Sequence, residues 1–133
     1  MIDFENYYVN AVAKAVRAKY PDAEIVSTFI PRPSAFPHVF IRETDNAADA
    51  ASFTLDGHEA NARLSYTIDI HSNSETDKKR ICREILAIVD LVMAKHYFRR
   101  IFANPFPNEN DAAIYRITAR YQKIQSEELE VQA

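Results

Sequence analysis

The segment ARLSYTIDIH, Ala62–His71, alternates apolar and polar residues without a break. Leu64, Tyr66, Ile68 and Ile70 fall on one side of an extended chain, and polar residues fall on the other. The alternation predicts a β-strand with one buried face and one polar face. This pattern is typical of an antiparallel sheet that is covered on a single side.

A helix that covers this sheet is predicted from Asp77 to about His96. Apolar residues recur there every three or four positions, which indicates one broad apolar face. Burial of an aliphatic side chain contributes about 1.5–3 kcal/mol, so we expect this helix to be the main packing element. Ser74 or Thr76 is expected to cap its start. The two adjoining apolar rows are Ile81, Ile85, Ile88 and Val92, and Cys82, Leu86, Val89 and Met93.

The remaining elements complete an α-β-β-β-α-β-β order. A first helix is expected over Ile2–Tyr20, with Asp3 as its N-cap and Pro21 ending it. The order predicts an α+β two-layer sandwich, with a mainly antiparallel sheet and both helices on one face. The other predicted strands are Glu24–Phe29, Val39–Glu43, Phe98–Phe102 and Ala113–Lys123. The predicted connections are Pro31–Pro37, Asp45–Glu59 with a hairpin near Asp56–Gly57, and Asn104–Asp111.

Length and composition narrow the range of functions. The 133 residues predict one domain, residues 1–125, followed by a flexible acidic tail, residues 126–133. Gly57 is the only glycine, which excludes the glycine-rich phosphate loops and the nucleophile elbow. Cys82 is the only cysteine, which excludes an intrachain disulfide and a multi-cysteine zinc site. A net charge of −3 argues against general polyanion binding, and no apolar run is long enough to span a membrane.

Few residues are arranged for catalysis or metal binding. Asp69 and His71 share a strand face, and with His58 they are a conceivable metal site, but polar surface residues explain them better. Cys82 lies on the apolar side of its helix and is expected to be a buried, inert thiol. The acidic residues of the Asp45–Glu59 segment do not have the spacing of a calcium loop. The sequence therefore predicts no enzyme activity, no cofactor and no metal.

Basic residues next to aromatic ones are the better candidates for function. Arginine and tyrosine together are typical of protein interfaces, although they also suit nucleic-acid stacking. The negative net charge favours a protein partner. The basic candidates are Lys78, Lys79, Arg80 and Arg83 at the start of the second helix, and Arg99, Arg100, Arg116 and Arg120, which lie among Tyr97, Phe98, Tyr115 and Tyr121.

Several segments together resemble one protein family. The most specific are Phe36–Asn46, FPHVFIRETDN, and Ile114–Tyr121, IYRITARY. With the strand Tyr66–Asn73 and the basic helix start at Lys78, they resemble the tail-terminator or head–tail joining proteins of long-tailed phages and prophages. The likeness runs from Ile2 to Lys123. The chain departs from it at Asp77 and His96, where family members often carry glycine.

The resemblance implies a non-enzymatic subunit that forms a ring, typically a hexamer, at the junction of tail and head in the virion. Such a ring caps the tail tube, ends its polymerisation and joins it to the head connector. DNA passes through the lumen without specific binding. Asp45 and Asn46 would begin a loop facing the lumen or the tube, and Arg116, Arg120 and Tyr121 would lie near subunit or tube contacts.

Two other classes of function stay open at this stage. One is a connector-side adaptor or minor capsid component. The other is a small enzyme or ligand-binding α+β domain. A ring with a central hole would favour the tail terminator, whereas a monomer that binds a metal or small molecule would favour the last class.

Overall fold

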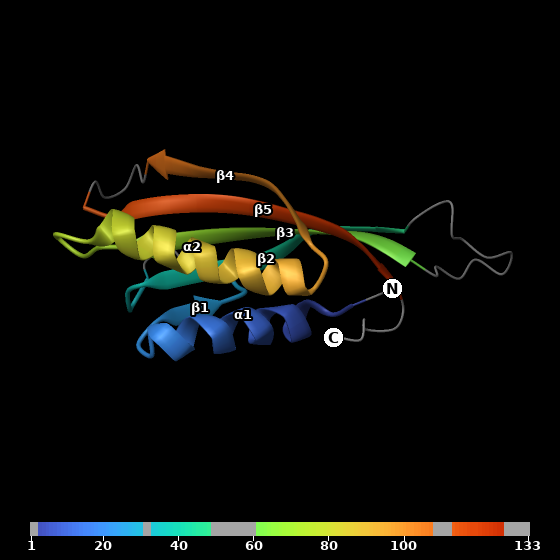
Figure 1. The fold of residues 1–133 in the computed structure, drawn as a ribbon, viewed down its shortest axis with the longest axis horizontal. Coiled ribbons are helices and arrows are strands. Elements are labelled where there is room, and N and C mark those ends of the chain that lie inside the picture. Colours follow the sequence, from blue (N-terminus) through green and yellow to red (C-terminus); the bar gives the residue numbers. More distant parts are fainter. Residues whose placement is uncertain (1–2, 31–32, 49–60, 108–112, 127–133) are drawn as a thin grey trace, which may run out of the picture.

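The computed structural model describes residues 3–30, 33–48, 61–107 and 113–126. Within them, two helices lie beside each other along the same side of a five-stranded sheet (Figure 1). The elements in chain order are α1 (Glu5–Lys19), β1 (Glu24–Val26), β2 (His38–Ala48), β3 (Asn61–Ser72), α2 (Lys78–Lys95), β4 (Arg99–Pro107) and β5 (Tyr115–Ser126). The predicted α+β two-layer fold and the α-β-β-β-α-β-β order are confirmed.

The sheet has the strand order β1-β2-β3-β5-β4. Only β1 and β2 pair in parallel, and the other three pairs are antiparallel. The alternating segment that predicts the fold is the central strand, β3. It pairs with β5 over its whole length, with Tyr66 opposite Tyr121. Because it is hydrogen-bonded on both sides, β3 sets the register of the sheet.

The hydrophobic core lies between the sheet and the helices. The predicted buried side of β3 is confirmed, because Leu64, Tyr66, Ile68 and Ile70 are fully buried. Burial of alternate residues on a strand leaves the residues between them on the opposite face. The two helices contribute the other large part of the core through the buried residues Tyr8, Val12 and Val16 of α1 and Cys82, Ile85, Val89 and Met93 of α2.

The second strand, β2, extends further than predicted. β2 continues through Asp45 to Ala48, so the predicted irregular segment begins later than expected. The cause is the β3 ladder: after an irregularity between Glu43 and Asp45, pairing resumes and continues until Ala48 meets Ala62. The rest of the predicted connection, residues 49–60 with the expected hairpin, lies outside the described residues, as do 108–112 and 127–133.

The outer strands make poor templates for further pairing. β4 continues past Phe102 to Pro107, although prolines were expected to mark a connection there. Proline is tolerated on an edge strand because its missing N–H is not needed on the unpaired side. β4 also has an irregularity between Arg100 and Phe102. On the opposite edge β1 is only three residues long, shorter than predicted.

The helix ends differ from the prediction by a few residues. Phe4 occupies the N-cap position of α1, and the Oδ1 atom of Asp3 accepts a hydrogen bond from the Glu5 N–H at 3.3 Å. Asp77 precedes α2 without capping it through its side chain, and Ser74 Oγ accepts a hydrogen bond from the Asp77 N–H at 3.2 Å. Neither described helix is long and apolar enough to cross a membrane.

The C-terminus of α2 closes with a turn that normally uses glycine. Tyr97 has a φ of 67°, in the left-handed region. The Tyr97 N–H donates to Ala94 and the Phe98 N–H donates to Met93, at 3.0 and 2.9 Å. These two bonds form a Schellman motif, in which the left-handed residue is usually glycine. In this chain the left-handed position is occupied by a tyrosine.

Candidate functional site on the open face of the sheet

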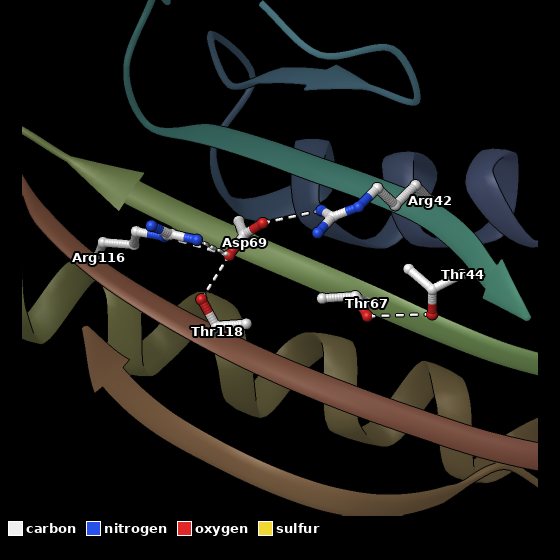
Figure 2. Close-up of polar contacts among 6 residues, drawn as sticks. All are labelled: Arg42, Thr44, Thr67, Asp69, Arg116 and Thr118. Atoms are coloured by element: carbon white, nitrogen blue, oxygen red, sulfur yellow. Dashed lines mark hydrogen bonds and ion pairs between the residues drawn. The ribbon is translucent and has the colours of Figure 1, made fainter. Parts of the chain in front are cut away.

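The face of the sheet away from the helices carries a cluster of polar side chains at its centre. Figure 2 shows Arg42 of β2, Asp69 of β3, and Arg116 and Thr118 of β5 on this face, with the helices behind the sheet. The strand register explains why these side chains come together. Asp69 lies directly opposite Thr118, and the two arginines reach it diagonally from the neighbouring strands. We call this surface the open face.

Asp69 is the centre of the cluster and is only 3% exposed. Its Oδ2 accepts a hydrogen bond from Arg42 Nη1 at 2.9 Å. Its Oδ1 accepts from Arg116 Nε and Nη2 at 3.2 and 3.0 Å, and also from the Thr118 hydroxyl. Both oxygens of the carboxylate are therefore occupied, which is what a buried charge requires.

The surroundings keep Asp69 ionised. Burial by itself would raise the pKa of Asp69, but the hydrogen bonds from Thr118, Arg42 and Arg116 outweigh it and hold the pKa below its usual value. The two arginines have side chains that are each 35% exposed. Asp69 is therefore a fixed negative charge beneath two partly exposed positive charges, and it holds their guanidinium groups in place.

Each arginine also lies near an aromatic ring. The guanidinium carbon of Arg42 is 4.6 Å from the ring centre of Phe40, and that of Arg116 is 6.0 Å from the ring centre of Phe106. These distances are typical of cation–π contacts. We call Phe40, Arg42, Asp69, Arg116 and Phe106 the open-face array. Arginine that is held rigidly beside aromatic rings is a composition found at protein interfaces.

The sequence anticipates part of this array. Arg116 and Arg120 lie on the open face, since the residues that alternate with them, Ile117, Ala119 and Tyr121, are buried in the core. Within the described part of the chain, Arg120 has no side-chain hydrogen bond or ion pair. Arg42 and Phe106 were not predicted as interface residues. The alternation of β2 places Arg42 on the polar face, but nothing local indicates that it meets Arg116 at a shared carboxylate.

Two other candidates, Tyr121 and Arg100, lie on the helix side of the sheet. Tyr121 is 1% exposed, and its hydroxyl donates to Asp90 of α2 at 3.0 Å. Arg100 also contacts Asp90, with its Nη1 atom 3.2 Å from Oδ2. These two residues connect α2 to β5 and β4. Tyr121 therefore stabilises the interior of the subunit and is too buried to contact another protein. Arg99 is exposed at the start of β4.

The basic start of α2 is a separate surface. Lys79 and Arg80 line a shallow depression with Thr76, Arg83, Glu84 and Ala87. Arg80 pairs with Asp77 and Glu84 at 3.2 and 2.9 Å. A hydrogen bond from Tyr20, followed by those from Arg80 and Lys19, lowers the pKa of Glu84 to about 2. Lys78 donates to the Ala113 carbonyl at 3.4 Å. The charge of Arg80 is thus balanced within the subunit.

Asp45 and Asn46 lie in β2 beyond its irregularity. Asp45 Oδ2 is 4.0 Å from Arg63 Nε, and Asn46 Nδ2 donates to Glu43 Oε2 at 3.4 Å. The two residues belong to the β2–β3 ladder. They are therefore strand residues and do not begin a loop at this point.

The residues considered for catalysis are in unreactive settings. Burial raises the pKa of Cys82 to about 12, and its thiol faces the carbonyls of Ile70 and Tyr115 at 3.7 and 3.5 Å. Burial lowers the pKa of His71 to about 4, while the nearby Asp69 opposes this shift. In the described ranges, no group of three metal-binding side chains comes together.

Comparison with known proteins finds a solved structure with a similar fold. A chain of the solved structure "Virion of native gene transfer agent (GTA) particle" superposes with a TM-score of 0.61 at 15% sequence identity. The match covers 86% of this chain and 88% of that one. No protein-family model and no curated protein sequence matches. Over nearly its whole length, the chain is thus similar in fold to a component of a gene transfer agent particle.

Proposed function

We propose that the protein is a structural subunit of a phage-type virion, where it forms a ring that caps the tail tube and joins it to the head connector. The observation that carries this proposal is the shared fold with a chain of a gene transfer agent virion, which spans both chains almost completely. It agrees with the resemblance of FPHVFIRETDN and IYRITARY to the phage tail-terminator family.

The chemistry of the open face supports an assembly role. A ring needs a surface that binds a different surface of the next copy, so that rotation closes the contact. The open-face array offers oriented arginines next to aromatic rings, which suits recognition of another protein. Asp69 is a buried carboxylate whose two oxygens accept hydrogen bonds from Arg42, Arg116 and Thr118. It is therefore a structural group.

Ring formation is tested by electron microscopy and size-exclusion chromatography of the purified protein. We expect ring-shaped particles with a central hole, typically hexamers. Arg120→Glu should abolish them while leaving the subunit folded, because Arg120 makes no side-chain hydrogen bond or ion pair within the described residues. Arg116 is unsuitable for this test, since its loss would also leave Asp69 poorly paired.

The matched control is Lys14→Glu, the same charge change at an exposed position of α1. It should leave the rings intact. A monomer under all conditions, including mixtures with tail tubes, would contradict the proposed ring. Incorporation on the head side of the junction, without contact to the tube, would favour the connector-side adaptor.

A further inference from the structure

We propose that the open face binds the acidic segment Glu127–Glu130 of a second copy of this chain. The inference rests on the proposed ring, because it names the contact that would join neighbouring subunits. It also gives that contact a direction: the end of β5 of one subunit meets the middle of the sheet of the next.

The receptor side is a pair of arginines that still have unused donors. A guanidinium group carries five N–H donors. Asp69 takes one from Arg42 and two from Arg116. Neither arginine has another acceptor in the described ranges of the chain. Because Asp69 fixes both groups at the surface, the remaining donors are already positioned for further carboxylates.

The open face also carries more positive than negative charge. Among the described residues, five positive charges share this face with three negative ones: Arg42, Arg63, Arg99, Arg116 and Arg120 with Glu24, Asp45 and Asp69. Exposed aromatic rings border these charges: Phe106 is 42% exposed, and Phe29, which lies against Phe40, is 68% exposed. An acidic segment with interspersed apolar residues is the complementary ligand.

One segment of the chain has this composition. Residues 127–131 read Glu-Glu-Leu-Glu-Val. The sequence has nineteen acidic and sixteen basic residues. Three of the acidic residues lie in this segment, so residues 1–126 carry sixteen of each, and their formal charge is zero. The net charge of −3 therefore resides in the segment that follows β5.

The backbone of this segment is too short to reach Asp69 of its own subunit. Asp69 lies opposite Thr118, eight residues before Ser126 on β5, a distance of about 26 Å along the strand. Glu130 is four residues beyond Ser126, and four extended residues span at most about 14 Å. Even a complete reversal of the chain leaves Glu130 short of Asp69. Within its own subunit the backbone of the segment therefore stops short of Asp69, a limit that does not apply to another copy.

The basic start of α2 is a weaker candidate for the same ligand. Arg80 already pairs with Asp77 and Glu84, and Glu84 also pairs with Lys19. A ligand carboxylate would compete with these groups. Ala87, in the middle of this surface, is exposed and makes no polar side-chain contact, which makes it a suitable control position.

The contact is tested by disulfide trapping between two different single-cysteine variants. Glu128→Cys places a thiol in the acidic segment, and Thr67→Cys places one on the open face beside Asp69 (Figure 2). The native Cys82 is fully buried and stays out of the exchange. When the two variants are mixed and oxidised, we expect a covalent heterodimer. Glu128→Cys mixed with Ala87→Cys should give at least tenfold less covalent heterodimer.

Three outcomes of the trapping experiment would overturn the inference. They are equal trapping at Ala87→Cys, an intrachain disulfide in the double variant Glu128→Cys/Thr67→Cys, or blockage of the Thr67→Cys reaction by double-stranded DNA, which would assign the open face to a polyanion. Rings that form unchanged when Glu127, Glu128 and Glu130 are all replaced by Lys would overturn this contact but leave the proposed function standing. Absence of rings in the native protein, with selective trapping retained, would overturn the proposed function alone.

Discussion

Arg42 and Arg116 bind the same buried carboxylate from two strands that do not pair with each other. Arg42 of β2 donates to Oδ2 of Asp69 at 2.9 Å, and Arg116 of β5 donates to Oδ1 at 3.2 and 3.0 Å. Asp69 lies on β3 between them. Three strands are therefore connected on the face opposite the two described helices.

Asp69→Asn should destabilise the subunit by about 2–3 kcal/mol, the range of hydrogen bonds to a charged group. The amide can still accept from Arg116 and Thr118, but its NH₂ group would face Arg42, and both arginines would lose their counter-charge. Urea unfolding measures the effect. Thr67→Val on the same face removes a hydrogen bond to Thr44 at 3.2 Å and is the control, with an expected loss below about 1 kcal/mol. Equal losses in the two variants would contradict a central role for Asp69.

His71 should make the stability depend on pH. Its pKa is about 4 in the folded protein, against an ordinary value of 6.5, because burial disfavours the charged ring. The unfolded chain therefore takes up a proton at a higher pH than the folded one. The contribution of His71 to stability is complete above pH 6.5 and is lost as the pH falls toward 4. The wild type should lose stability over this interval relative to His71→Phe, and parallel pH profiles of the two proteins would contradict this.

Tyr97→Gly should stabilise the protein by about 1 kcal/mol. A non-glycine residue in the left-handed region costs about 1–2 kcal/mol, and glycine removes that cost at the price of some chain entropy. Thermal unfolding is the measurement. Lys95→Gly, two residues earlier and inside the helix, should instead destabilise by a similar amount. If both glycines destabilised the protein, the turn at Tyr97 would not be strained.

Cys82 should resist alkylation in the native protein. Its side chain is fully buried and its pKa is raised to about 12, so little thiolate exists at neutral pH. Iodoacetamide labelling, followed by mass spectrometry, should become fast only in denaturant. Rapid labelling of the native protein would mean that α2 separates readily from the sheet, and would also require removal of Cys82 before disulfide trapping.

The fold could be predicted because its signals are local. The alternation in β3 and the apolar rows of α2 each indicate an element by themselves, and both are buried as expected. The strand ends were less predictable, because partners that are distant in sequence determine them. Asp45 continues β2 because it pairs with Ser65 of β3. Pro105 can lie in β4 because that strand is at the edge of the sheet.

The candidate site was only partly predictable for the same reason. Arg116 and Arg120 stand out in the sequence as arginines in an alternating strand. Arg42 does not, since its importance arises from a carboxylate 27 positions away. Lys123 shows the opposite case. A lysine on the inner side of β5 has no local sign of burial, yet its Nζ donates to the His96 carbonyl at 2.8 Å and to the Tyr8 hydroxyl at 3.1 Å.

The outer strands have a consequence for how copies of the chain can associate. β1 is short, and β4 combines two prolines with a break in its register. Backbone hydrogen bonding from sheet to sheet would otherwise allow unlimited growth into fibrils. With both edges blunted, recognition between copies depends on side chains, whose number and geometry are finite. An assembly built in that way can stop at a defined size.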